Sequence, residues 1–137
     1  MGAWGIGIFE NDDSCDWLYD LEKSTDLLVI ESALNHSDAD YIEAPEGCCI
    51  LAAAEIIIAL QGNAKEGLPE NAASWVSQNS SLMDTSHLNI KAIQAIDKVL
   101  SDVSELKELW EETDDFKSWV EDVEKIKAAL LKKIIRD

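Results

Sequence analysis

Apolar residues recur at intervals of three and four along most of the chain, which is the spacing of one face of an α-helix. A first helix is expected to be capped by Asn11 or Asp12, and a second to begin at Ser24 or Thr25. Their apolar positions are Trp17, Leu18 and Leu21 in the first, and Leu27, Leu28, Ile30 and Leu34 in the second. These patterns predict two amphipathic helices in the first quarter of the chain.

A third helix is predicted from Pro45 to about Gln61, and it is apolar over nearly its whole circumference. Its apolar positions are Ile50, Leu51, Ala53, Ala54, Ile57, Ile58 and Leu60. A helix without a polar face has to be surrounded by other elements. We therefore expect residues 48–60 to form the centre of the core.

Further helices are expected from Asn71, from about Ser86, from Ser104 and from about Asp115. The last has the most regular period, with apolar residues at Phe116, Trp119, Val120, Val123, Ile126, Leu130, Leu131 and Ile134. There is no convincing strand pattern and no internal repeat. The sequence predicts a single compact all-α domain over residues 1–137, with six or seven helices.

The chain opens with three glycines, at positions 2, 5 and 7, that alternate with large apolar residues. These apolar residues are Trp4, Ile6, Ile8 and Phe9. Glycine lets one segment approach another closely. We therefore expect this strip to pack onto the helices, although its weak alternation has no partner strand.

Several short segments of the sequence resemble the bacterial family called domain of unknown function 4259. At the start they are Gly2-Ala3-Trp4-Gly5, Phe9-Glu10-Asn11-Asp12 and Asp16-Trp17; further on they are residues 51–55, Gly67-Leu68-Pro69, Ser104-Glu105-Leu106 and residues 109–112. The resemblance spans essentially the whole chain. It implies membership of the family and no particular activity.

The charge of the chain is strongly negative, with 28 acidic and 11 basic residues and a net charge of −17. Such a field repels nucleic-acid phosphates and anionic membranes and attracts cationic partners. There is no signal-peptide pattern, and the longest apolar run is too short to span a bilayer. Three cysteines, two of them adjacent at Cys48 and Cys49, do not predict a disulfide framework, so a cytoplasmic location is expected.

The acidic residues are concentrated in two regions of the sequence. Residues 10–46 hold 12 acids and one base, Lys23, whereas residues 105–124 hold nine acids and two bases. The predicted partner-binding residues in the first region are Asp12, Asp13, Asp16, Asp20, Asp38, Asp40 and Glu43; those of the secondary patch are Glu111, Glu112, Asp114 and Asp115. The last 13 residues reverse the sign, with four lysines and one arginine. A solvated acidic surface without a partner remains an alternative interpretation.

Candidate catalytic residues are few. Glu55 lies in the apolar third helix and, if buried, needs a partner, which could be the Trp4 indole or an amide near Gly5 or Gly7. A raised pKa would instead make it a candidate general acid or base. Asp12, Asp13 and Asp16 lack the spacing and the glycine of a calcium loop, so we interpret them as helix-capping residues.

The other groups with metal-binding or nucleophilic chemistry do not form a motif. His36 and His87 lie 51 positions apart and are expected at the surface, and the three cysteines, including Cys15, are expected in the core. The sequence therefore predicts no metal site and no cofactor. No phosphate-binding loop, dinucleotide motif or catalytic triad is recognisable.

These observations favour an acidic cytoplasmic binding protein over an enzyme. Small acidic bacterial domains without catalytic motifs resemble immunity proteins, which neutralise toxins, and nuclease toxins have basic active sites. Two alternatives stay open: an acidic adaptor for another basic protein, or a small enzyme or metal-dependent hydrolase. The enzyme would use Glu55 or the carboxylates of Asp12, Asp13 and Asp16.

Overall fold

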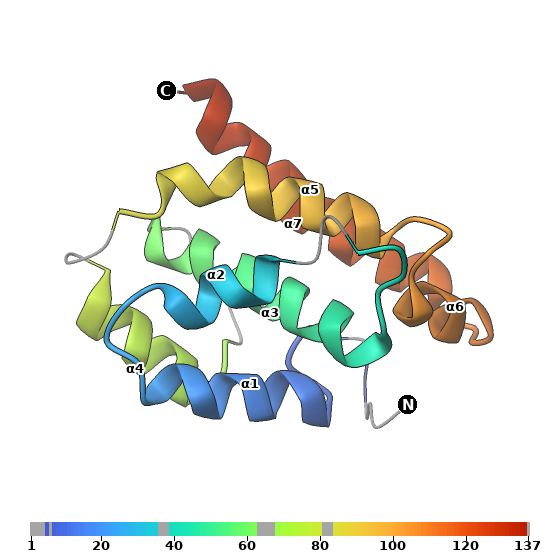
Figure 1. Cartoon of the computed structure of the whole chain (residues 1–137), viewed down its shortest axis with the longest axis horizontal. Helices are drawn as coiled ribbons and strands as arrows, with labels where there is room; N and C mark the ends of the chain where they lie inside the picture. The colour runs from blue at the N-terminus through green and yellow to red at the C-terminus, as the bar shows by residue number, and fades with distance from the viewer. Residues whose placement is uncertain (1–4, 6, 36–38, 63–67, 81–83, 137) are drawn as a thin grey trace.

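The computed structural model describes residues 5, 7–35, 39–62, 68–80 and 84–136, with side chains described as far as residue 134. These residues form seven α-helices and one short 3-10 helix, and they contain no strand (Figure 1). The elements are α1 (Asp12–Glu22), α2 (Leu28–Leu34), α3 (Ala44–Leu60), α4 (Glu70–Asn79), the 3-10 helix η1 (Ser86–Leu88), α5 (Asn89–Val99), α6 (Glu105–Glu111) and α7 (Phe116–Arg136). The predicted all-α fold is confirmed. None of the described helices combines the length and apolarity needed to cross a bilayer.

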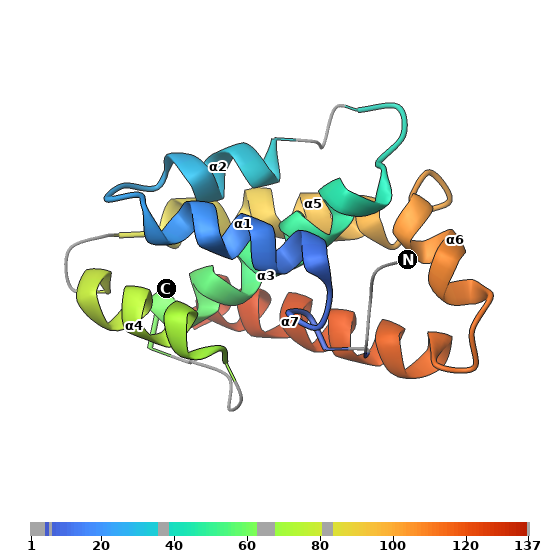
Figure 2. The same ribbon diagram turned by 90° about the horizontal axis from the view of Figure 1, so that it is seen from below.

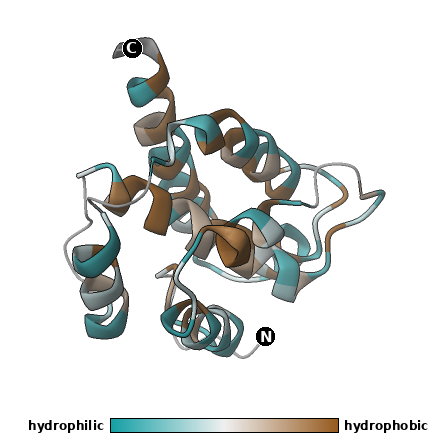
Figure 3. Ribbon diagram, turned by 60° about the vertical axis from the view of Figure 1, so that its left-hand side comes forward, coloured by the Kyte–Doolittle hydropathy of each residue, from teal (hydrophilic) through white to brown (hydrophobic). Residues whose placement is uncertain are grey.

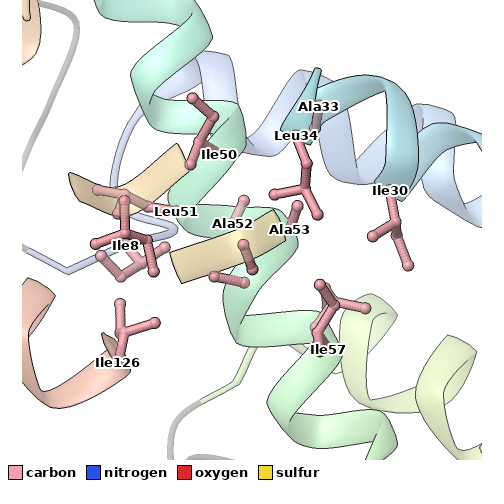
Figure 4. Close-up of a cluster of buried hydrophobic side chains, with 14 of the residues drawn as sticks. Ile8, Ile30, Ala33, Leu34, Ile50, Leu51, Ala52, Ala53, Ile57 and Ile126 are labelled. Atoms are coloured by element: carbon pink, nitrogen blue, oxygen red, sulfur yellow. The ribbon is translucent and has the colours of Figure 1, made fainter. Parts of the chain in front are cut away.

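Helix α3 is the centre of the fold, as the sequence predicts. It contacts each of the other six α-helices, and every residue from Ile50 to Leu60 is buried. Figure 4 shows its side chains meeting those of α2, α7 and the N-terminal strip. Because each side of α3 faces another element, its uniform apolar composition is what this position requires.

The ends of α3 are set by local chemistry. Pro45 occupies the first turn, and the Glu46 carboxylate accepts a hydrogen bond from the Glu43 amide at 3.1 Å, completing a capping box. At the other end Gly62 has a φ of +92°, a conformation that favours glycine and stops the helix. Both boundaries lie within one residue of those predicted.

The C-terminal half of the chain covers α3 with α5, α6 and α7. α5 and α7 run side by side (Figures 1 and 2), and Trp119 of α7 stacks on Trp110 of α6 with ring centroids 6.2 Å apart. The Asn89 amide donates to the Leu130 carbonyl at 3.2 Å, which links α5 to α7. Figure 3 shows the last turns of α7 extending beyond the other helices.

The second helix begins later than predicted. α2 begins at Leu28, because the Asp26 side chain accepts from the Leu28 amide at 3.0 Å and forms a turn before the helix. Ser24 instead bonds back to the Leu21 carbonyl at the end of α1. One consequence is that Leu28, predicted on the apolar face, is 64% exposed.

The N-terminal strip packs on the helices where it is described. Ile8 is buried and Phe9 packs against the core, whereas Trp4 and Ile6 lie outside the described residues. Asn11 joins the strip to α1: its side chain accepts from the Ser14 amide at 2.8 Å and donates to the Ile8 carbonyl at 3.1 Å. The prediction that this segment is anchored is confirmed for Ile8 and Phe9.

Candidate functional site

The carboxylates of α1 form an acidic stripe on its outer side. Asp12, Asp16 and Asp20 are all exposed and stand four residues apart, so they share one face of the helix. None of the three makes an ion pair with any residue that the structure describes. Like charges four residues apart destabilise a helix modestly. The stripe therefore remains unneutralised within the described part of the protein.

Asp13 lies on the inner side of the same helix. It is half-buried and lines a small, partly open cavity of about 20 Å³ beneath the N-terminal strip, together with Ile8, Asn11 and Leu51. A cavity of this size holds about one water molecule. Asp12 and Asp13 also lie in the first turn of α1, where negative charge complements the helix dipole. The cap itself is Asn11, so the interpretation of the aspartates as helix-capping residues is wrong, although Asp12 and Asp13 do favour the start of the helix by their charge.

The loop before α3 joins the two acidic regions, which are far apart in sequence. Ile42 and Ser104 form an isolated parallel β-bridge, with the Ile42 amide bonded to the Val103 carbonyl at 2.8 Å. Beside it, the Tyr41 hydroxyl donates to Glu108 at 3.0 Å. The loop and the start of α6 therefore form one continuous surface.

Carboxylates crowd around Tyr41, which is 43% exposed on this surface. Desolvation raises the pKa of Tyr41, and the hydrogen bond to Glu108 and the charges of Glu108, Glu105 and Glu43 raise it further. Each of these causes disfavours the phenolate. Tyr41 thus reports a negative potential where the first acidic region meets α6.

One of the predicted binding residues has a structural role. Glu43 precedes α3 and belongs to its capping box. Glu105, which was not among the predicted residues, accepts from the Ala44 amide at 2.7 Å beside it. Asp40 is exposed, and Asp38 lies outside the described residues. Asp40 is thus a cleaner test of surface charge in this loop than Glu43.

The secondary acidic patch lies at the far end of α6 and in the turn to α7. Glu111, Glu112, Asp114 and Asp115 are all exposed there. Asp115 precedes α7, and its carbonyl accepts from the Trp119 amide at 2.9 Å. The four residues therefore lie close together in sequence between α6 and α7, and Figure 2 shows α6 at one end of the molecule.

Glu55 is buried in α3, with 5% of its surface exposed, and it is engaged by a partner within the protein. Of the partners predicted for it, Trp4 lies outside the described residues, and the Gly7 amide donates to Glu10 at 3.2 Å instead. The described part of the chain holds no group of three His, Cys, Asp or Glu side chains able to bind a metal. His87 is exposed, as expected, and His36 is not among the described residues.

The cysteines differ from the prediction in one case. Cys48 is buried and Cys49 half-buried, but Cys15 is exposed on α1 and its thiol lies 3.4 Å from the Phe9 carbonyl. The prediction that Cys15 belongs to the core is wrong, because this position lies on the exposed side of α1 together with Asp12 and Asp16. Burial raises the pKa of Cys48 to about 12, and the charge of Asp13 adds to the shift.

Comparisons with known proteins identify the family. No curated protein and no solved structure matches the chain. The family model described as Domain of unknown function (DUF4259) matches residues 2–122, which include the strip, the acidic α1 and the whole of α3. The chain therefore belongs to the DUF4259 family.

Proposed function

We propose that this protein is an acidic binding protein of the bacterial cytoplasm, and that its α1 stripe engages a basic protein. The observation that carries this proposal is the arrangement of Asp12, Asp16 and Asp20, exposed on one face of α1 without an ion pair to any described residue. A partner with lysines or arginines at matching positions relieves the repulsion within the stripe. It is also drawn to this surface by long-range attraction.

The partner that best fits this surface is a toxin, and the protein is then its immunity protein. Nuclease toxins have positive clefts because they hold phosphates, and an acidic protein can occupy such a cleft or its rim. The small cavity beneath the N-terminal strip, about 20 Å³, has no room for a substrate, so it does not support an enzyme site between this strip and α1.

The first experiment isolates the partner and measures association directly. The tagged protein is purified from its native cells, a copurifying protein is identified by mass spectrometry, and the two are recombined as purified proteins. Stopped-flow association is then compared for wild type, for Asp16→Lys with Asp20→Lys, and for Glu111→Lys with Glu112→Lys. Both double variants change the net charge by the same amount, so they separate a local contact from the overall field.

The α1 variant should slow association about tenfold or more at low salt, and the difference should shrink as salt rises, because exposed charges are screened over about 8 Å at physiological ionic strength. The α6 variant should have a much smaller effect. Equal binding by both variants and wild type would show that electrostatic recognition is the wrong mechanism. For the immunity form, co-expression with a toxin encoded beside the gene should permit growth, and the α1 variant should fail to protect.

A further inference from the structure

An open groove of about 560 Å³ lies where α1, α2 and the first turns of α3 meet. Its apolar lining residues are Trp17, Leu28, Val29, Ala33, Pro45 and Cys49. This volume is within the range of sites that accommodate a side chain or a small ligand. The groove is therefore large enough to receive part of another molecule.

The charged residues of the groove are all acidic. Asp20 and Glu46 line it, and no lysine or arginine does. Burial raises the pKa of Cys49 to about 11, and the charges of Asp13, Asp20, Glu46 and Asp16 add to the shift. The Cys49 thiol of the groove therefore lies in a negative potential, to which Asp20 and Glu46 contribute from the groove itself.

One exposed side chain makes the groove an incomplete surface. Leu28 exposes 64% of its area at the start of α2, an unfavourable position for a large aliphatic side chain. Trp17 lines the groove as well and is 8% exposed, whereas its indole N–H is buried and has no acceptor among the residues that the structure describes. A buried donor without an acceptor is costly to maintain.

We propose that this groove receives an apolar side chain of the basic partner, from a segment with lysines or arginines on both sides of that side chain. The apolar residue packs against Leu28 and Val29, and the flanking cations face Asp16 and Asp20. This inference rests on the proposed function and assigns the contact site. A second copy of the chain is a poor occupant, since each copy carries a net charge of −17.

Isotope-labelled full-length protein and three synthetic peptides test this assignment. The first peptide has a central leucine flanked by lysines, the second replaces the leucine with serine, and the third replaces the lysines with glutamates. The Trp17 indole signal, assigned by its loss in Trp17→Phe, should shift with the first peptide, and the amides of α2 should shift with it. The serine peptide should bind at least fivefold more weakly, and the glutamate peptide should not bind.

Equal affinity for the leucine and serine peptides overturns the inference, as does binding that leaves the Trp17 signal unmoved. Failure of the first peptide to bind overturns it as well. Sedimentation of the free protein gives a further check. A dimer that Leu28→Ala dissociates would make a second copy the occupant and also overturn the proposal.

Variants in the copurifying-partner assay separate this inference from the proposed function. Leu28→Ala should weaken partner binding about five- to tenfold, chiefly through faster dissociation, and the loss should persist at high salt. The matched control is Ile90→Ala on α5, another aliphatic residue, 59% exposed, which should change the affinity less than twofold. If Asp16→Lys with Asp20→Lys weakens binding but Leu28→Ala does not, the groove is wrong and the acidic binding function stands. If only Leu28→Ala weakens it, the groove is a contact site for an apolar side chain, but the pairing of cations with Asp16 and Asp20 is wrong and the electrostatic proposal fails.

Discussion

Asn11 should be among the most sensitive polar positions in the chain, because it makes two buried hydrogen bonds. Its side-chain oxygen Oδ1 caps α1 by accepting from the Ser14 amide, and its side-chain nitrogen Nδ2 donates to the Ile8 carbonyl. The residue is 8% exposed. Replacing it with alanine removes both bonds and opens the link between the N-terminal strip and the acidic helix.

The size of the effect follows from these two contacts. Loss of an asparagine N-cap costs about 1 kcal/mol, and a buried carbonyl left without a donor costs about 1–3 kcal/mol. Asn11→Ala should therefore lower the free energy of unfolding by about 2–4 kcal/mol. Asn11→Ser keeps a capping oxygen, but its side chain cannot reach the Ile8 carbonyl. Its free energy of unfolding should therefore fall only by the cost of the unpaired carbonyl, about 1–3 kcal/mol.

Urea unfolding followed by circular dichroism measures both variants. Asn35→Ala is the matched control: Asn35 is exposed at the end of α2, and its loss should change the unfolding free energy by less than about 0.5 kcal/mol. The free energy of unfolding should be lowest for Asn11→Ala, intermediate for Asn11→Ser and highest for wild type. If Asn11→Ala is as stable as Asn35→Ala, the strip is not joined to α1 through this side chain.

Three further predictions concern the strip and the thiols. Removal of residues 1–9 should lower the melting temperature in circular dichroism, because buried Ile8 is lost; an unchanged value would show a free arm. At neutral pH, iodoacetamide should alkylate exposed Cys15 well before Cys48, and equal rates in mass spectrometry would contradict this order. The raised pKa of Cys48 stabilises the fold below the ordinary thiol pKa of 9.0, and this contribution should be lost as pH rises toward about 12. Urea unfolding across this range should then show a shallower pH dependence for Cys48→Ala than for wild type.

The sequence predicted the helical fold and the central position of α3 because both depend on local pattern. A helix that is apolar all round has one stable environment, and contacts between α3 and every other α-helix supply it. The caps at Asn11 and Ser104 were likewise predictable, since each side chain bonds an amide three residues ahead.

Features that depend on distant parts of the chain were not predictable. The pairing of Ile42 with Ser104, which joins the acidic loop to α6, leaves no trace in the periodicity of either segment. The exposure of Leu28 was also not predicted from the sequence, because the Asp26 turn delays the start of α2 and changes which positions face the core. The acidic residues were found from composition, but the groove beside them was not.

The carboxylates on and around α1 and the start of α3 fall into two groups, according to whether they bond a backbone amide within the fold. Glu10 accepts from the Gly7 amide, Glu46 from the Glu43 amide and Glu105 from the Ala44 amide, so each satisfies a backbone donor. Asp16 and Asp20 have no such bond and no ion pair with any described residue, yet they stand one turn apart, where they repel each other. Solubility alone would be served by charge placed anywhere on the surface. Two unneutralised carboxylates on one helix face, beside a groove with an exposed leucine, therefore support the proposed contact with a basic partner.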